Sequence, residues 1–97
     1  MSIVADIAIM PVGEGTSLSK YIKRAVEELK KSGLKIEVGA MSTCVEAQST
    51  EQIFKAFEKV KEALFEMGAK RVYATIRIDE RRDKRISIES KKSAVLQ

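Results

Sequence analysis

Residues 34–47, with the sequence LKIEVGAMSTCVEA, decide the fold of this chain of 97 residues. In the first five positions apolar side chains at 34, 36 and 38 alternate with charged ones, as in a strand with one buried face. Small residues at 39, 40 and 42 permit a tight reversal, and residues 43–47 predict a second, short strand. The segment therefore predicts two consecutive antiparallel strands in the middle of the chain.

An amphipathic helix is predicted immediately before this hairpin. Thr16 or Ser17 offers its N-cap, Lys30 and Lys31 lie in its last turn, and Gly33 follows its end. The apolar residues recur at helical spacing: Leu18, Tyr21, Ile22, Ala25, Val26 and Leu29.

A second helix is predicted immediately after the hairpin. Ser49 and Gln52 resemble a capping box at its start, and Gly68 marks its end. Its apolar stripe consists of Ile53, Phe57, Val60, Leu64 and Met67. Phe54, Ala56 and Phe65 widen the stripe, and packing against the C-terminal tail or another subunit would account for this.

Two further strands are predicted outside the helices, at residues 3–10 and 72–78, and Pro11 ends the first of them. In each, every second residue is apolar and would face the helices. The opposite sheet face would carry Val4, Asp6, Ala8, Met10, Tyr73, Thr75 and Arg77. That mixture is too apolar to be left bare, so a second subunit or a ligand is expected to cover it.

The element order is therefore β-α-β-β-α-β, which predicts an α+β sandwich of the ferredoxin-like type. Two helices would cover one face of a four-stranded antiparallel sheet, in a single domain spanning residues 1–97. From residue 87 onward the chain would form either a short final helix or a frayed tail. This fold hosts many functions, so the function must come from the site.

Composition excludes several classes of function. The chain is 44% hydrophobic and 33% charged, and it has no histidine and one cysteine, Cys44. A zinc site or a histidine-dependent triad therefore cannot be built within it, and neither metal nor cofactor is expected. The N-terminus carries Asp6 and lacks a basic leader, and no segment is apolar enough to span a membrane, so a cytoplasmic protein is expected. A net charge of +4 is ordinary for this size and gives no reason to expect nucleic-acid binding.

Four local features are candidates for chemistry or have a plainer structural role. Asp6 and Glu46 are the acids placed in or beside the sheet, either as an acid–base pair or, more simply, as partners in structural hydrogen bonds. The loop at residues 12–17 precedes a helix and is either an anion site or a turn with a cap. The charged run at 79–85 mixes both signs and is typical of a solvated or intersubunit salt-bridge cluster. Cys44 is interpreted as a small buried hydrophobe.

Several stretches together resemble one known family. They are the segments at residues 9–13 (IMPVG), 16–19 (TSLS), 39–47 (GAMSTCVEA), 71–73 (RVY) and 78–83 (IDERRD). These resemble the small thiamine-binding, YkoF-related family, and the likeness extends from Ile3 to about Lys84. The resemblance implies ferredoxin-like subunits that form dimers through their sheets, and often tetramers. It also implies binding of thiamine or its hydroxymethylpyrimidine moiety, without a known catalytic activity.

The resemblance also implies particular site residues. The family's Thr-x-x-Glu motif falls on Thr43 and Glu46, although Ser42 and Ala47 stand where the family usually has glycines. Glu46 would accept a hydrogen bond from the pyrimidine amino group and attract the thiazolium cation, while Thr43 would donate or accept another. An apolar or stacking wall would come from Met10, Pro11 and Tyr73, and Ser17 is a further candidate ligand contact.

A plainer interpretation of these residues stays open. Thr43 and Glu46 would then only stabilise the hairpin, and Ser17 would cap the helix rather than contact a ligand. The leading hypothesis is a non-catalytic, homo-oligomeric binding protein for thiamine or a related pyrimidine. The alternative is a structural or regulatory module that assembles through its sheet and has no small-molecule site.

Overall fold

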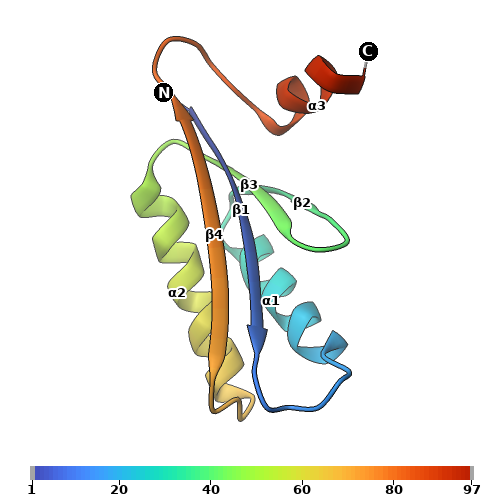
Figure 1. Ribbon diagram of the computed structural model, residues 1–97. Helices are drawn as coiled ribbons and strands as arrows, with labels where there is room; N and C mark the ends of the chain where they lie inside the picture. Colours follow the sequence, from blue (N-terminus) through green and yellow to red (C-terminus); the bar gives the residue numbers. More distant parts are fainter. Residues whose placement is uncertain (1, 97) are drawn as a thin grey trace.

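The computed structural model describes residues 2–96 and has the predicted β-α-β-β-α-β order, followed by a third helix (Figure 1). The elements are β1 (Ser2–Pro11), α1 (Ser19–Lys31), β2 (Lys35–Val38), β3 (Thr43–Ala47), α2 (Thr50–Glu66), β4 (Val72–Arg81) and α3 (Ile88–Leu96). The strands form one antiparallel sheet in the order β2-β3-β1-β4. The predicted ferredoxin-like α+β fold is confirmed.

The hairpin between β2 and β3 closes over residues 39–42, as predicted. The N–H of Gly39 donates to the carbonyl oxygen of Ser42 at 2.8 Å. A Cβ atom at position 39 would lie 2.8 Å from that same oxygen, so the close approach of the two backbones requires glycine here.

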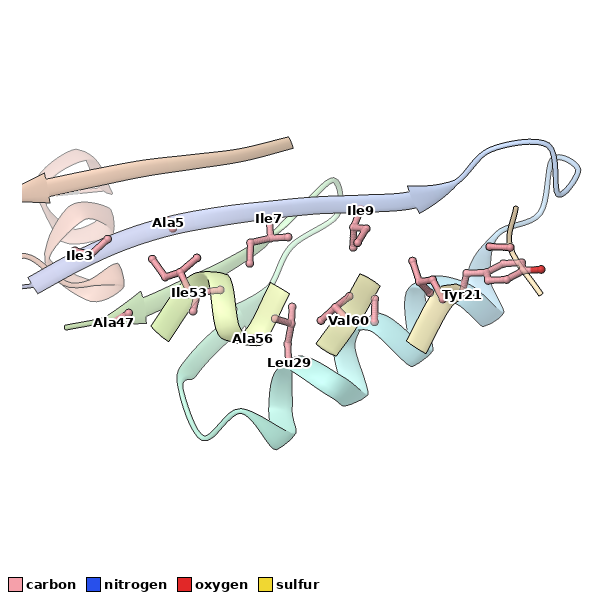
Figure 2. Close-up of a cluster of buried hydrophobic side chains, with 14 residues drawn as sticks. Ile3, Ala5, Ile7, Ile9, Tyr21, Leu29, Ala47, Ile53, Ala56 and Val60 are labelled. Carbon is pink, nitrogen blue, oxygen red and sulfur yellow. The ribbon is translucent and has the colours of Figure 1, made fainter. Parts of the chain in front are cut away.

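Both α1 and α2 pack against one face of the sheet and enclose the main core (Figure 2). The side chains of Ile3, Ala5, Ile7 and Ile9 extend from one face of β1 toward the helices. The most completely buried side chains come from every layer: Ile3, Leu29, Val45, Ile53, Val60 and Leu64. Each contributes about 1.5–3 kcal/mol of transfer free energy on burial.

The two helices begin in different ways. Ser49 caps α2 as predicted, because its hydroxyl accepts from the N–H of Gln52 at 3.3 Å. The expected cap of α1 by Thr16 or Ser17 is wrong. The N-cap is Leu18, which makes no side-chain capping bond, and its carbonyl oxygen accepts from the N–H groups of residues 21 and 22. Leu18 also packs against the core, so apolar anchoring replaces a polar cap.

On the other face of the sheet, α3 covers one end and leaves the other exposed. We call this the open face of the sheet. The residues predicted for it do share it, because β1 and β4 pair Val4 with Asp79, Asp6 with Arg77 and Met10 with Tyr73. Val4 forms a small apolar cluster with Ile86 and Ile88, against which Cys44 packs. The C-terminal segment is therefore a docked helix rather than a tail. Within residues 2–96, no helix has the length and apolar character needed to cross a bilayer.

Candidate functional site

An apolar groove lies between α1, the β2–β3 hairpin and the last residues of β1. Its volume is about 260 Å³, and none of its lining side chains is charged. The walls come from Ile22 and Val26 on one side and from the hairpin residues 38–43 on the other. Ile22 and Val26 were expected to form part of the buried stripe of α1. Instead Ile22 is exposed and Val26 half-buried, because the groove opens in front of them.

The floor of the groove is an unpaired stretch of strand edge. In the part of the chain that the structure describes, β3 pairs with β1 only from Ile3 to Ile7, whereas β4 pairs with it as far as Pro11. The N–H of Val12 donates to the carbonyl oxygen of Arg71 at 2.8 Å and continues the β1–β4 register. Alternate residues of an antiparallel strand turn their backbone groups to opposite edges. Ile9 therefore turns its N–H and C=O away from β4 and into the groove.

Thr43 and Met10 both line this groove. Thr43 is only 7% exposed and is the last β3 residue paired with β1, opposite Ile7. A hydroxyl, a backbone donor and a backbone acceptor are thus brought to one apolar cavity. Sequence patterns indicated Thr43 and Met10 but missed Ile9, whose contribution comes from its backbone.

Glu46 lies on the opposite face of the sheet from Thr43. Glu46 lies three positions after Thr43, an odd offset, so the two side chains point to opposite faces of β3. The Glu46 carboxylate accepts a hydrogen bond from the N–H of Ile88 at 2.6 Å, at the start of α3. A carboxylate is favourable at a helix N-terminus, so Glu46 anchors α3. The structure does not bring Thr43 and Glu46 together within one chain.

The remaining expected site residues are dispersed. Tyr73 is 58% exposed on the open face, beside Met10 across the β1–β4 pair. Pro11 is buried, and its parity in β1 places it on the helix-facing side. Ser17 is exposed in the loop before α1. In the same loop, Glu14 accepts a hydrogen bond from the Tyr21 hydroxyl at 2.8 Å, and this carboxylate makes the loop unfavourable for an anion.

Asp6 is the centre of a polar cluster on the open face of the sheet. Its carboxylate accepts from Arg77 Nε at 2.9 Å, from a terminal Arg77 nitrogen at 2.6 Å and from the Ser42 hydroxyl at 3.0 Å. The hydrogen bond from Arg77 is the main cause that holds the pKa of Asp6 below its usual value, against the opposing effect of burial. Asp6 is therefore a fixed anion and a poor general acid. In residues 2–96 no group of three metal-ligating side chains is present.

The fold and groove define a class: a ferredoxin-like sandwich with a small, uncharged cavity beside its central strand. Comparison with known proteins identifies the family. The family model described as thiamine-binding protein matches residues 5–96, and the chain belongs to this family.

Its relatives are spread over archaea and bacteria. A UPF0045 protein of Methanocaldococcus jannaschii is 41% identical over 93 residues, covering 96% of this chain and 91% of the relative. The crystal structure of that organism's protein superposes with a TM-score of 0.89 at 40% identity, covering 97% and 95% of the two chains. A Thermotoga maritima structure, described provisionally as a thiamine biosynthesis or salvage protein, gives a TM-score of 0.83 at 32% identity, covering 97% and 98%.

The hydrogen bond from Ile88 to Glu46 predicts that Glu46→Ala releases α3. Amide hydrogen exchange in residues 88–96 should accelerate, while exchange in β1 stays unchanged. The matched control is Glu37→Ala, which removes the exposed ion pair between Glu37 and Lys92. Such pairs contribute only about 0–1 kcal/mol, so the control should have little effect. Equal acceleration in both variants would contradict the anchoring role of Glu46.

The lowered pKa of Asp6 predicts a specific pH dependence of stability. A carboxyl whose folded-state pKa lies below its unfolded-state value stabilises the fold above the unfolded-state value. That contribution is lost as the pH falls through the folded-state pKa. Asp6→Asn should therefore destabilise the protein at neutral pH, and its difference from wild type should shrink in acid below about pH 4.

Urea unfolding at several pH values measures this difference. Glu27→Gln, on the exposed side of α1, is the control for removing a carboxylate. A deficit for Asp6→Asn that is the same at every pH would show that Asp6 contributes through packing rather than charge.

Proposed function

We propose that this protein is a non-catalytic, homo-oligomeric binding protein for thiamine or a related pyrimidine, held in the groove beside β1. Membership of the thiamine-binding family supports a small-molecule role. The observation that carries the proposal is the free edge of β1, where the N–H and C=O of Ile9 face an apolar cavity.

An aminopyrimidine matches this edge chemically. Its exocyclic amino group is a donor and its neighbouring ring nitrogen an acceptor, so the two would bond to the C=O and N–H of Ile9. Thr43 would satisfy a further polar atom, and Ile22 and Val26 would contact the faces of the ring. The groove volume of about 260 Å³ is slightly below the range of about 300–1,000 Å³ typical of ligand pockets. That size suits a single ring better than a large cofactor.

The groove favours binding over catalysis. Its lining side chains include no acid, base or charged group, so a bound molecule would meet no proton donor or acceptor stronger than a hydroxyl. Self-association is the second part of the proposal, and it is supported by the exposed apolar side chains on the sheet, Met10 and Tyr73 among them.

Calorimetry with thiamine and hydroxymethylpyrimidine tests the site. Thr43→Val should weaken binding about 2- to 10-fold, because it removes one hydrogen bond and keeps the shape of the side chain. The control, Glu46→Gln on the opposite face, should leave the affinity unchanged. Loss of binding in Glu46→Gln with normal binding in Thr43→Val would place the ligand on the open face. Folded protein that gives neither heat nor a thermal shift at high ligand concentration would overturn the proposed function.

The uncharged lining also predicts how the two ligands compare. Thiamine differs from hydroxymethylpyrimidine by a cationic thiazolium ring, and the groove has no carboxylate to attract that charge. The two dissociation constants should therefore agree within about tenfold, or 1.4 kcal/mol. A thiamine affinity greater by several orders of magnitude would show that an acidic group outside this groove takes part.

A further inference from the structure

We propose that Asp6 and Ser42 are positioning residues for the groove: the hydrogen bond between them, on the open face of the sheet, fixes the β2–β3 hairpin as one wall of the groove. The inference rests on the proposed function, because it concerns the cavity in which the pyrimidine would bind. It adds that Asp6, which does not line this cavity, sets its shape.

The tip of the hairpin, residues 39–42, has few contacts with the rest of the fold. It lies beyond the last residue pair of β2 and β3, and Met41 is 90% exposed. In the part of the chain that the structure describes, one hydrogen bond closes the tip, from Gly39 to Ser42, and one ties it to another strand, from Ser42 to Asp6. The position of the tip therefore depends on Ser42.

Strand register brings Ser42 to Asp6. β1 and β3 pair Asp6 with Cys44, and Ser42 comes two positions before Cys44, so it lies on the same face of the sheet as a diagonal neighbour of Asp6. Its hydroxyl donates to Asp6 Oδ2 at 3.0 Å. Thr43, between Ser42 and Cys44, points to the other face and lines the groove. The tether therefore holds the backbone directly next to a groove residue.

Asp6 is a firmly held acceptor. Nε and a terminal nitrogen of Arg77 donate to its two carboxylate oxygens at 2.9 and 2.6 Å, and this two-point contact fixes the plane of the carboxylate. A hydrogen bond to an ionised carboxylate is also stronger than one between neutral groups. Arg77 therefore orients Asp6, and Asp6 in turn holds Ser42.

The groove exists because β3 does not continue alongside β1. Continuing their register by two residues would pair Ile9 with Met41 and occupy the free edge of β1. Instead the chain turns at residues 39–42, and this turn is closed through the carbonyl oxygen of Ser42. The Ser42 hydroxyl holds the same residue on the open face. Because both groups are engaged, the tip neither closes over Ile9 nor moves away from it.

Amide hydrogen exchange in the ligand-free protein is the first part of the experiment. Ser42→Ala removes the hydroxyl and should accelerate exchange of the Gly39 amide about tenfold, as expected for the loss of a hydrogen bond to a charged group. Exchange at Val45, in the buried part of β3, should not change. Ser42→Thr keeps a hydroxyl and should behave as the wild type. Ser93→Ala, at an exposed position of α3, is the matched control.

Calorimetry with hydroxymethylpyrimidine is the second part, on Ser42→Ala, Asp6→Ala and the double variant. Each single substitution should raise the dissociation constant about 3- to 10-fold. The double variant should bind no more weakly than the singles, because all three lack the same hydrogen bond. Glu80→Ala is the control, since it removes an exposed ion pair with Arg82, 3.0 Å long, from the same sheet.

This cycle separates positioning from direct contact. Ser42 also lines the groove, so its hydroxyl could bond to the ligand itself. Weaker binding in Ser42→Ala with normal binding in Asp6→Ala would show such a direct contact and overturn the inference, as would additive effects in the double variant. The exchange measurement decides the inference even where Asp6→Ala does not fold, because it needs only the Ser42 variants.

The two parts also separate this inference from the proposed function. Unchanged exchange at Gly39 in Ser42→Ala would overturn the inference whether or not a pyrimidine binds. Equal acceleration at Gly39 and Val45 would overturn it too, because the effect would then be a loss of global stability. If Gly39 alone accelerates and the wild type binds no pyrimidine, the proposed function fails while the positioning of the hairpin is supported.

Discussion

The register of β1 between β3 and β4 is the constraint on which the other features depend. β1 is an inner strand, paired on one side with β3 through Ile7 and on the other with β4 through Pro11. Because alternate residues of a strand point to opposite faces and bond to opposite edges, this register assigns each group a location. It places Asp6 against Arg77 on the open face, buries Ile9 in the core and leaves the backbone of Ile9 unpaired in the groove.

The same register places the two polar residues of the Thr-x-x-Glu motif on opposite faces of the sheet. Thr43 closes the β3 side of the groove, while Glu46 holds the N-terminus of α3 on the other face. The motif therefore joins a candidate ligand contact to a structural anchor. Glu46 could contact a ligand in the groove only if it came from another subunit.

Local sequence patterns predicted the helices and strands, whereas the pairing of β1 with β3 and β4 determined the location of the candidate site. The turn at Gly39 and the cap at Ser49 depend on interactions within a few residues, so the sequence indicated both. The start of α1 was predicted wrongly, because Leu18 is held by core packing rather than by a hydroxyl. Strand alternation alone would have separated Thr43 from Glu46. The groove could not be predicted, because it exists only where β3 ends before β1 does.

The proposed pyrimidine site lies at the free edge of β1. Backbone amide chemical shifts, followed by NMR as hydroxymethylpyrimidine is added, test it most directly. The largest changes, with slowed hydrogen exchange, should occur at Ile9 and in the hairpin around Thr43, while Glu46 and Ile88 should be unaffected. The largest changes at Glu46 and Ile88, with Ile9 unchanged, would contradict it.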